Sequence, residues 1–164
     1  MTTKSCSMMS SEAGTWMNRA DKILNGVAAY AAYYRSNPHR FVKDYLHIEL
    51  RLFQKIMIVM MNICTVVVFF GARGIGKTFL SAIFCVVRAI LYPGSKICIA
   101  SGVRSQSIIV LEKIMLELKP NSPELAAEID ERQTKVNGTN AQIVFKNGLI
   151  QWLTGTGMCL IQPA

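Results

Sequence analysis

Apolar residues recur at helical spacing through the first third of the chain. Between Ala20 and Tyr34 they fall on one face, which predicts a first amphipathic helix. Asn37-Pro38 then places an N-cap residue before a proline at the first helical position, so a second helix is expected to follow. The helical pattern resumes over Leu50–Met61 and predicts a third helix.

Beyond this point the pattern changes to alternating strands and helices. Val66–Phe70 is a β-branched and aromatic run of the buried-strand type, and a glycine-rich turn separates it from an apolar helix predicted over Lys77–Leu91. A second strand is predicted at Lys96–Ala100 and a further helix at Ser105–Leu118. Strands that alternate with helices favour a parallel sheet with right-handed crossovers.

The last part of the chain predicts a short helix and a hairpin. Pro123–Arg132 has helical spacing and follows Ser122, a good N-cap residue. Asn147-Gly148 stands between two apolar runs, Ala141–Lys146 and Leu149–Leu153, and favours a two-residue hairpin turn because both of its residues tolerate positive φ.

These elements divide the chain into three parts. Residues 1–18 form a Ser- and Thr-rich tail without periodicity, residues 19–62 form a helical segment, and residues 63–164 hold the alternating strands and helices.

Composition narrows the class of protein. The 164 residues are 51% hydrophobic and carry a formal charge of +8, which suggests an anionic partner, although ordinary solubility charge explains it equally simply. Five cysteines without a C-x-x-C pair favour a reducing compartment, and no secretion signal opens the chain. The apolar run Ile56–Phe70 is shorter than the ~20 residues of a membrane span, so no membrane association is expected.

The strongest chemical signal lies between the predicted strand and helix. It matches the Walker A pattern G-x-x-x-x-G-K-S/T at every position, and its residues are Gly71, Ala72, Arg73, Gly74, Ile75, Gly76, Lys77 and Thr78. Glycines let backbone N–H groups curl around phosphates, and the following helix adds its dipole. Lys77 is expected to reach the β- and γ-phosphates, and the Thr78 hydroxyl to ligate Mg²⁺.

Two other residues are candidates for nucleotide contacts. Arg73, within the loop, could stabilise charge on the γ-phosphate as a cis arginine finger does, or could be a solvated loop residue. Gln54, upstream, could offer a donor and an acceptor to an adenine edge, or could be a plain surface residue of a helix.

The acidic strand that normally completes such a site is missing. The only Asp-Glu pair is Asp130-Glu131, and the stretch before it has helical spacing with a charge inside it. We therefore reject this pair as the acid that would hold Mg²⁺ and activate water.

Several of these residues together resemble the start of the large subunit of tailed-phage terminases. The matching segments, in order, are Tyr33–Phe41, Leu50–Gln54, Ala72–Thr78, Ala89–Pro93, Ser101–Gln106 and Phe145–Gly148. The resemblance covers about residues 33–150, and an arginine inside the phosphate loop is a habit of that family.

The resemblance implies an ATPase that drives double-stranded DNA into a viral procapsid in the host cytoplasm, with the portal and the small terminase subunit as partners. It implies an α/β fold of the P-loop NTPase (ASCE/RecA-like) type, a parallel sheet flanked by helices, with an N-terminal helical extension. It assigns Lys77 and Thr78 to triphosphate and Mg²⁺, Gln54 to the adenine of ATP, and Arg73 to the γ-phosphate. A homo-oligomer is left open.

The family's acidic Walker B strand and nuclease domain are expected beyond the Asn147-Gly148 hairpin, and residues 151–164 do not resemble the family's continuation. We therefore expect a chain truncated before the Walker B motif, with an incomplete sheet, that binds ATP but turns it over poorly. Two alternatives remain: an ATPase of the superfamily 2 helicase type, which the arginine in the loop disfavours, and a nucleotide-binding remnant without catalysis.

Overall fold

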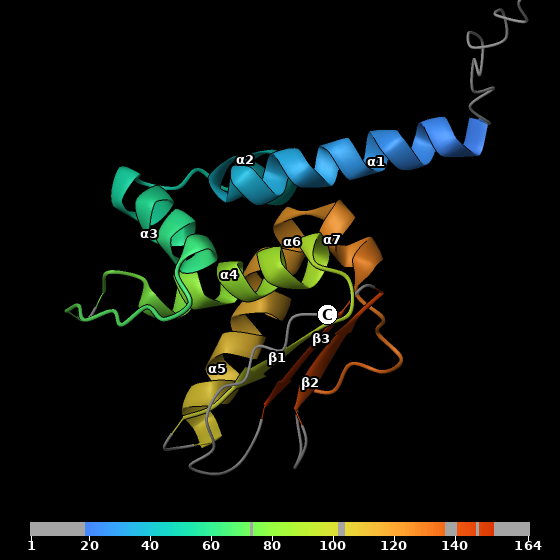
Figure 1. The fold of residues 1–164 in the computed structure, drawn as a ribbon. Coiled ribbons are helices and arrows are strands. Elements are labelled where there is room, and N and C mark those ends of the chain that lie inside the picture. The colour runs from blue at the N-terminus through green and yellow to red at the C-terminus, as the bar shows by residue number, and fades with distance from the viewer. Residues whose placement is uncertain (1–18, 73, 102–103, 137–140, 147, 153–164) are drawn as a thin grey trace, which may run out of the picture.

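Three helices precede the glycine-rich loop. The computed structural model describes residues 19–72, 74–101, 104–136, 141–146 and 148–152, so the predicted tail at residues 1–18 lies outside the described residues (Figure 1). The three helices are α1 (Arg19–Ser36), α2 (Pro38–Leu46) and α3 (Leu52–Ile63). The predicted helices are confirmed: the bounds of α1 and α3 agree with the prediction to within two residues at each end, and α2 begins at Pro38 as Asn37-Pro38 indicated.

The elements after the loop begin with α4 (Lys77–Leu91), whose bounds agree with the prediction. The others, in chain order, are β1 (Ser95–Ile99), α5 (Arg104–Lys113), the π-helical turn η1 (Ile114–Leu118), α6 (Lys119–Asn121), α7 (Pro123–Glu128), β2 (Gln142–Phe145) and β3 (Gly148–Trp152). The predicted cap of α7 is confirmed, because the Ser122 hydroxyl accepts the backbone N–H of Leu125 at 3.2 Å.

The described strands form a small mixed sheet in the order β1-β3-β2. β2 and β3 pair antiparallel, with Ile143 opposite Ile150, which confirms the predicted hairpin pairing, although Asn147 of its turn lies outside the described residues. β1 and β3 pair parallel, with Ile97 opposite the same Ile150. The carboxy-terminal hairpin therefore supplies β2 and β3, and β1 is added along the other edge of β3.

The predicted P-loop NTPase fold with a parallel sheet flanked by helices is wrong. Helices dominate the described residues, and their one sheet has three strands of mixed direction. The first predicted strand, Val66–Phe70, contributes nothing to it. In the described part of residues 63–164, this mixed sheet stands where a parallel sheet was expected.

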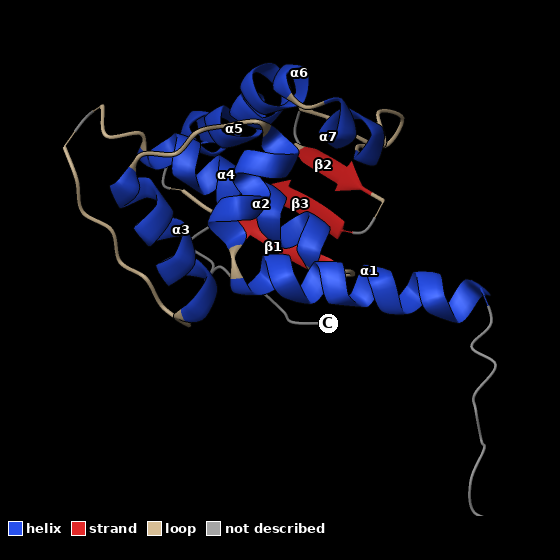
Figure 2. Ribbon diagram, turned by 90° about the horizontal axis from the view of Figure 1, so that it is seen from above, coloured by secondary structure: helices blue, strands red, loops and turns tan. Residues whose placement is uncertain are grey.

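Val66–Phe70 runs through the long connection between α3 and α4, which projects from the body of the fold (Figures 1 and 2). Its side chains are largely exposed: Val66 at 78%, Val68 at 71% and Phe70 at 88%. The core closes without this segment, because α4 already packs against β1 and β3 on one side and against α2 on another. A buried-strand composition alone therefore did not specify burial.

Replacing Val68 with lysine is expected to raise the solubility of the protein and to change the free energy of unfolding by less than about 0.5 kcal/mol, because the site is exposed. Residues 65–70 carry no charge, proline or glycine, and such exposed β-prone segments promote self-association. Light scattering at increasing concentration measures the effect. Val68→Ile is the control and should scatter like the wild type; a Val68→Lys protein that unfolds would show instead that the segment is buried.

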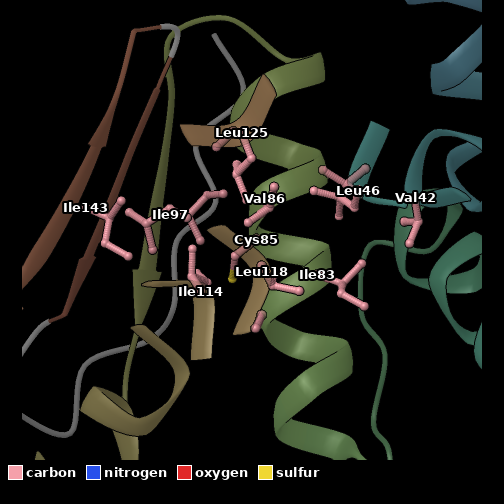
Figure 3. Close-up of a cluster of buried hydrophobic side chains, with 14 of the residues drawn as sticks. Val42, Leu46, Ile83, Cys85, Val86, Ile97, Ile114, Leu118, Leu125 and Ile143 are labelled. Carbon is pink, nitrogen blue, oxygen red and sulfur yellow. The ribbon is translucent and has the colours of Figure 1, made fainter. Parts of the chain in front are cut away.

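The core centres on α4, which lies between the sheet and α2 (Figure 3). Ile83 and Val86 of α4 are fully buried. The helix meets Ile97 of β1 on the sheet side and Leu46 of α2 on the other side. Because α4 also starts in the glycine-rich loop, its burial fixes the orientation of the loop's helical end.

Polar contacts tie the helices to one another around this core. The fully buried Ser122 donates its hydroxyl to the carbonyl of Tyr45 at 2.7 Å and so joins α7 to the end of α2. At the far end of α4, Arg35 of α1 donates its Nε–H to the Leu91 carbonyl at 2.9 Å. Its guanidinium also lies 5.0 Å from the ring centre of Tyr92. Across the described residues, every helix is too short or too polar to cross a membrane.

Candidate functional site

The Walker A residues Gly71–Thr78, here called the phosphate loop, end in the first turn of α4. Gly76 is the N-cap of α4 with φ of 87°, and Gly74 has φ of 89°. Both values lie in the left-handed region that glycine adopts without a steric penalty. The glycines therefore let the chain turn sharply into α4, whose free amino-terminal N–H groups favour an anion.

Lys77, at the end of the phosphate loop, is hydrogen-bonded to the start of the loop. Its Nζ donates hydrogen bonds to the carbonyl of Gly71 at 2.7 Å and to the carbonyl of Ala72 at 2.8 Å. These bonds hold the ammonium over the start of the loop, next to the amino-terminal end of α4. A bound polyphosphate would offer this ammonium an anionic partner in place of two neutral carbonyls.

Gln54 approaches the same loop from the start of α3. Its Oε1 accepts the backbone N–H of Arg51 at 2.9 Å, which fixes the side chain at the amino-terminal end of the helix. Its Nε2 lies 3.7 Å from the point that a Cβ on Gly76 would occupy. Residues 22 positions apart in the chain are thus brought into contact, as the predicted nucleotide contact of Gln54 requires.

An open hollow of about 560 Å³ lies where α3 meets the phosphate loop. Its described lining is Arg51, Phe53, Gln54, Gly74, Ile75, Gly76 and Phe79. The lining combines two aromatic rings and an amide with one cation, and none of these residues is acidic. An uncharged aromatic ring with polar edges, joined to an anionic group, matches this combination.

The structure brings most of the predicted site residues together. Gly71, Ala72, Gly74, Gly76 and Lys77 form the hydrogen-bonded loop, and Ile75 lines the hollow. Thr78 is the second residue of α4 and is partly buried. Arg73, the predicted γ-phosphate contact, lies outside the described residues.

The rejected pair, Asp130-Glu131, does not line the hollow at the phosphate loop, and both side chains have other partners. Glu131 forms an ion pair with Lys119, and Asp130 accepts the backbone N–H of Arg132 within its own turn at 3.0 Å. The segment before them holds the helix α7, but this helix ends at Glu128, so the part of the predicted helix beyond it is wrong, and Ile129 forms a bridge with Phe145 instead. In the described parts of the chain, no group of three or more His, Cys, Asp or Glu side chains could hold a metal ion.

Sequence reasoning missed three residues of the hollow, Arg51, Phe53 and Phe79. Arg51 is the N-cap of α3, a position at which arginine gives no capping signal. Phe79 lies in the first turn of α4, where a helical pattern marks it only as an apolar residue. Their role depends on the contact between α3 and the loop, and no local signal could reveal it.

The chain was compared with family models, with curated proteins and with solved structures. None of the three comparisons found a match.

Proposed function

We propose that the phosphate loop binds ATP together with Mg²⁺. The observation that carries this proposal is the convergence of three features: the αL glycines, the Lys77 ammonium at the start of α4, and the Gln54 amide beside Gly76. The first two are what the Walker A pattern needs for a triphosphate, and the third is placed to reach the edge of a base. The proposal rests on this loop and its two helices and does not require a parallel sheet.

Different residues of the site would contact different parts of the nucleotide. Lys77 and the first N–H groups of α4 would hold the phosphates. The Thr78 hydroxyl would supply one ligand to Mg²⁺, an ion that commonly takes few protein ligands beside phosphate oxygens and water. Phe53, which lines the hollow and is 39% exposed, would offer a flat apolar face to the base, and Gln54 would bond the base's edge.

The family resemblance gives this binding a biological role. We propose that the chain is the ATP-binding, amino-terminal part of a terminase large subunit, which in the full protein couples ATP hydrolysis to movement of double-stranded DNA. The proposed setting is the host cytoplasm, with the portal and small subunit as partners. The charge of +8 supports an anionic partner such as DNA.

Titration of ATP with Mg²⁺ into the whole chain tests the proposal by calorimetry. We expect saturable heat with one site per chain, and slower hydrogen exchange at the amides of Gly74, Gly76 and Lys77 when ATP is bound. An absence of both saturable heat and amide protection would refute nucleotide binding. AMP, which lacks the β- and γ-phosphates, is the matched control and should bind far more weakly.

Gln54→Ala is expected to weaken ATP binding by about fivefold to thirtyfold, which corresponds to one or two hydrogen bonds of about 1 kcal/mol each. The same change should reduce the preference for ATP over GTP, because the amide reads the edge of the base. Competition binding of both nucleotides measures the two effects. Equal losses for ATP and GTP would mean that Gln54 only positions the start of α3.

A further inference from the structure

A second hollow lies on α2 and the start of α3, and it shares no lining residue with the hollow at the phosphate loop. It measures about 480 Å³ and is rimmed by charged side chains, among them Arg40, Lys43 and Lys55. We call it the basic hollow. Two carboxylates, Asp44 and Glu49, also line it, so its three permanent cations exceed its acids by one.

Both acids of the basic hollow already have partners. Glu49 forms an ion pair with Lys43 at 3.5 Å, and Asp44 accepts the hydroxyl of Tyr34 at 3.0 Å. Burial, followed by this hydrogen bond, raises the pKa of Tyr34, so the hydroxyl stays protonated as a donor. Among the described residues, Lys55 and Arg40 have no carboxylate within ion-pair distance.

His39 adds a polar atom that lacks a partner. Its Nδ1 is buried, and no hydrogen bond reaches it from the described part of the chain. Buried polar atoms are nearly always bonded, because leaving one unpaired costs about 1–3 kcal/mol. His39 lines the basic hollow and is partly exposed, so its buried Nδ1 would gain a partner there if the ring turned toward a ligand.

An apolar groove of about 310 Å³ adjoins the basic hollow, and His39 and Lys55 line both. The rest of its described lining is one face of α3: Leu52, Ile56, Val59 and Met60. The spacing of these residues places them in one stripe along the helix. Leu52 is 75% exposed and Ile56 is 54% exposed, so the stripe is uncovered.

We propose that these adjoining hollows form one binding site for a small amphipathic anion, a molecule with a single acidic head on an apolar chain. The head would lie by Lys55, Arg40 and His39, and the apolar chain would lie along Leu52, Ile56 and Met60. Charge decides the occupant: a second copy of this surface would bring the same excess of cations, whereas an anion gives Lys55 and Arg40 the carboxylate partner that they lack among the described residues. The combined dimensions suit a small molecule.

Octanoate is the probe, because a carboxylate avoids the affinity of the phosphate loop for phosphate. We expect saturable binding of octanoate, with acetate (head alone) and octanol (chain alone) each at least about fivefold weaker. Changes in the NMR signals of His39 and Ile56 should follow the same titration. Octanoate that binds no better than octanol would overturn the role of the basic hollow.

Variants separate this site from its neighbours. Lys55→Gln should weaken octanoate about fivefold and leave octanol unchanged, and Lys55→Arg should restore most of the loss. Lys22→Gln, at an exposed lysine of α1 that lines neither hollow, is the control of equal charge and should bind octanoate as the wild type does. Equal losses in Lys55→Gln and Lys22→Gln would refute the site. Lys77→Ala should leave octanoate binding intact, so this proposal can fail or succeed independently of ATP binding.

Discussion

Replacing Ile83 with alanine is expected to lower the free energy of unfolding by about 2–5 kcal/mol, the range for isoleucine-to-alanine changes in a core. Ile83 is fully buried on the middle turns of α4, the helix that the sheet and α2 both contact (Figure 3). Truncation would leave a cavity that these surrounding elements can fill only in part, because each is held by its own packing. Urea unfolding followed by circular dichroism measures the loss.

Ile109→Ala is the matched control for this prediction. It makes the same chemical change on α5, where the side chain is 43% exposed, and it should cost less than about 1 kcal/mol. Comparable losses for the two variants would show that α4 is not the centre of the core. A small loss for Ile83→Ala alone would show that the core around it collapses to fill the gap.

The helices could be predicted because the signals that define them are local. Asn37-Pro38 begins α2 at the predicted residue, although Asn37 contributes no capping bond and its Nδ2 instead donates to the Tyr33 carbonyl at 3.2 Å. Gly76 begins α4 where the phosphate-loop pattern places it. Each of these signals acts within one helical turn, so the sequence around it is sufficient to read it.

The sheet could not be predicted in the same way, because strand pairing joins segments that are distant in sequence. Ser95 pairs with Gly148, 53 positions away, and no local sequence signal near either residue predicts this pairing. The hairpin partner of β3 was predictable, since Asn147-Gly148 specifies a local reversal. Val66–Phe70 shows the opposite limit: its β-prone composition fits a buried strand, yet the described core is complete without it.

The candidate site was predictable in its chemistry and not in its full membership. The Walker A pattern identifies the loop, and the structure places Gln54, a candidate before the resemblance assigned it to adenine, beside Gly76. Arg51 and Phe79 enter only because the first turns of α3 and α4 share one hollow. The basic hollow and its adjoining groove had no sequence signal, because His39 and Lys55 come from different helices.

Lys77→Ala is expected to weaken ATP binding by about 10- to 100-fold, which corresponds to the ~1.5–3 kcal/mol of a hydrogen bond to a charged group. Within the described residues the Lys77 ammonium donates to the carbonyls of Gly71 and Ala72, which hold it over the start of the phosphate loop. Truncation removes the phosphate contact and these two hydrogen bonds together. Alanine is a good helix former at this position, so the thermal midpoint should change little.

Two variants distinguish a specific contact between Lys77 and the phosphates from a general effect of its charge. Lys96→Ala removes the same charge from an exposed position of β1 and should leave ATP binding unchanged. Lys77→Arg keeps the charge but replaces a compact ammonium by a planar fork, and we expect intermediate binding. If Lys77→Ala and Lys96→Ala weakened ATP equally, the attraction would come from the overall charge of +8 and the phosphate loop would hold no specific site. A loss confined to Lys77→Ala would instead locate the triphosphate at the start of α4, where the helix dipole and the ammonium act on the same anion.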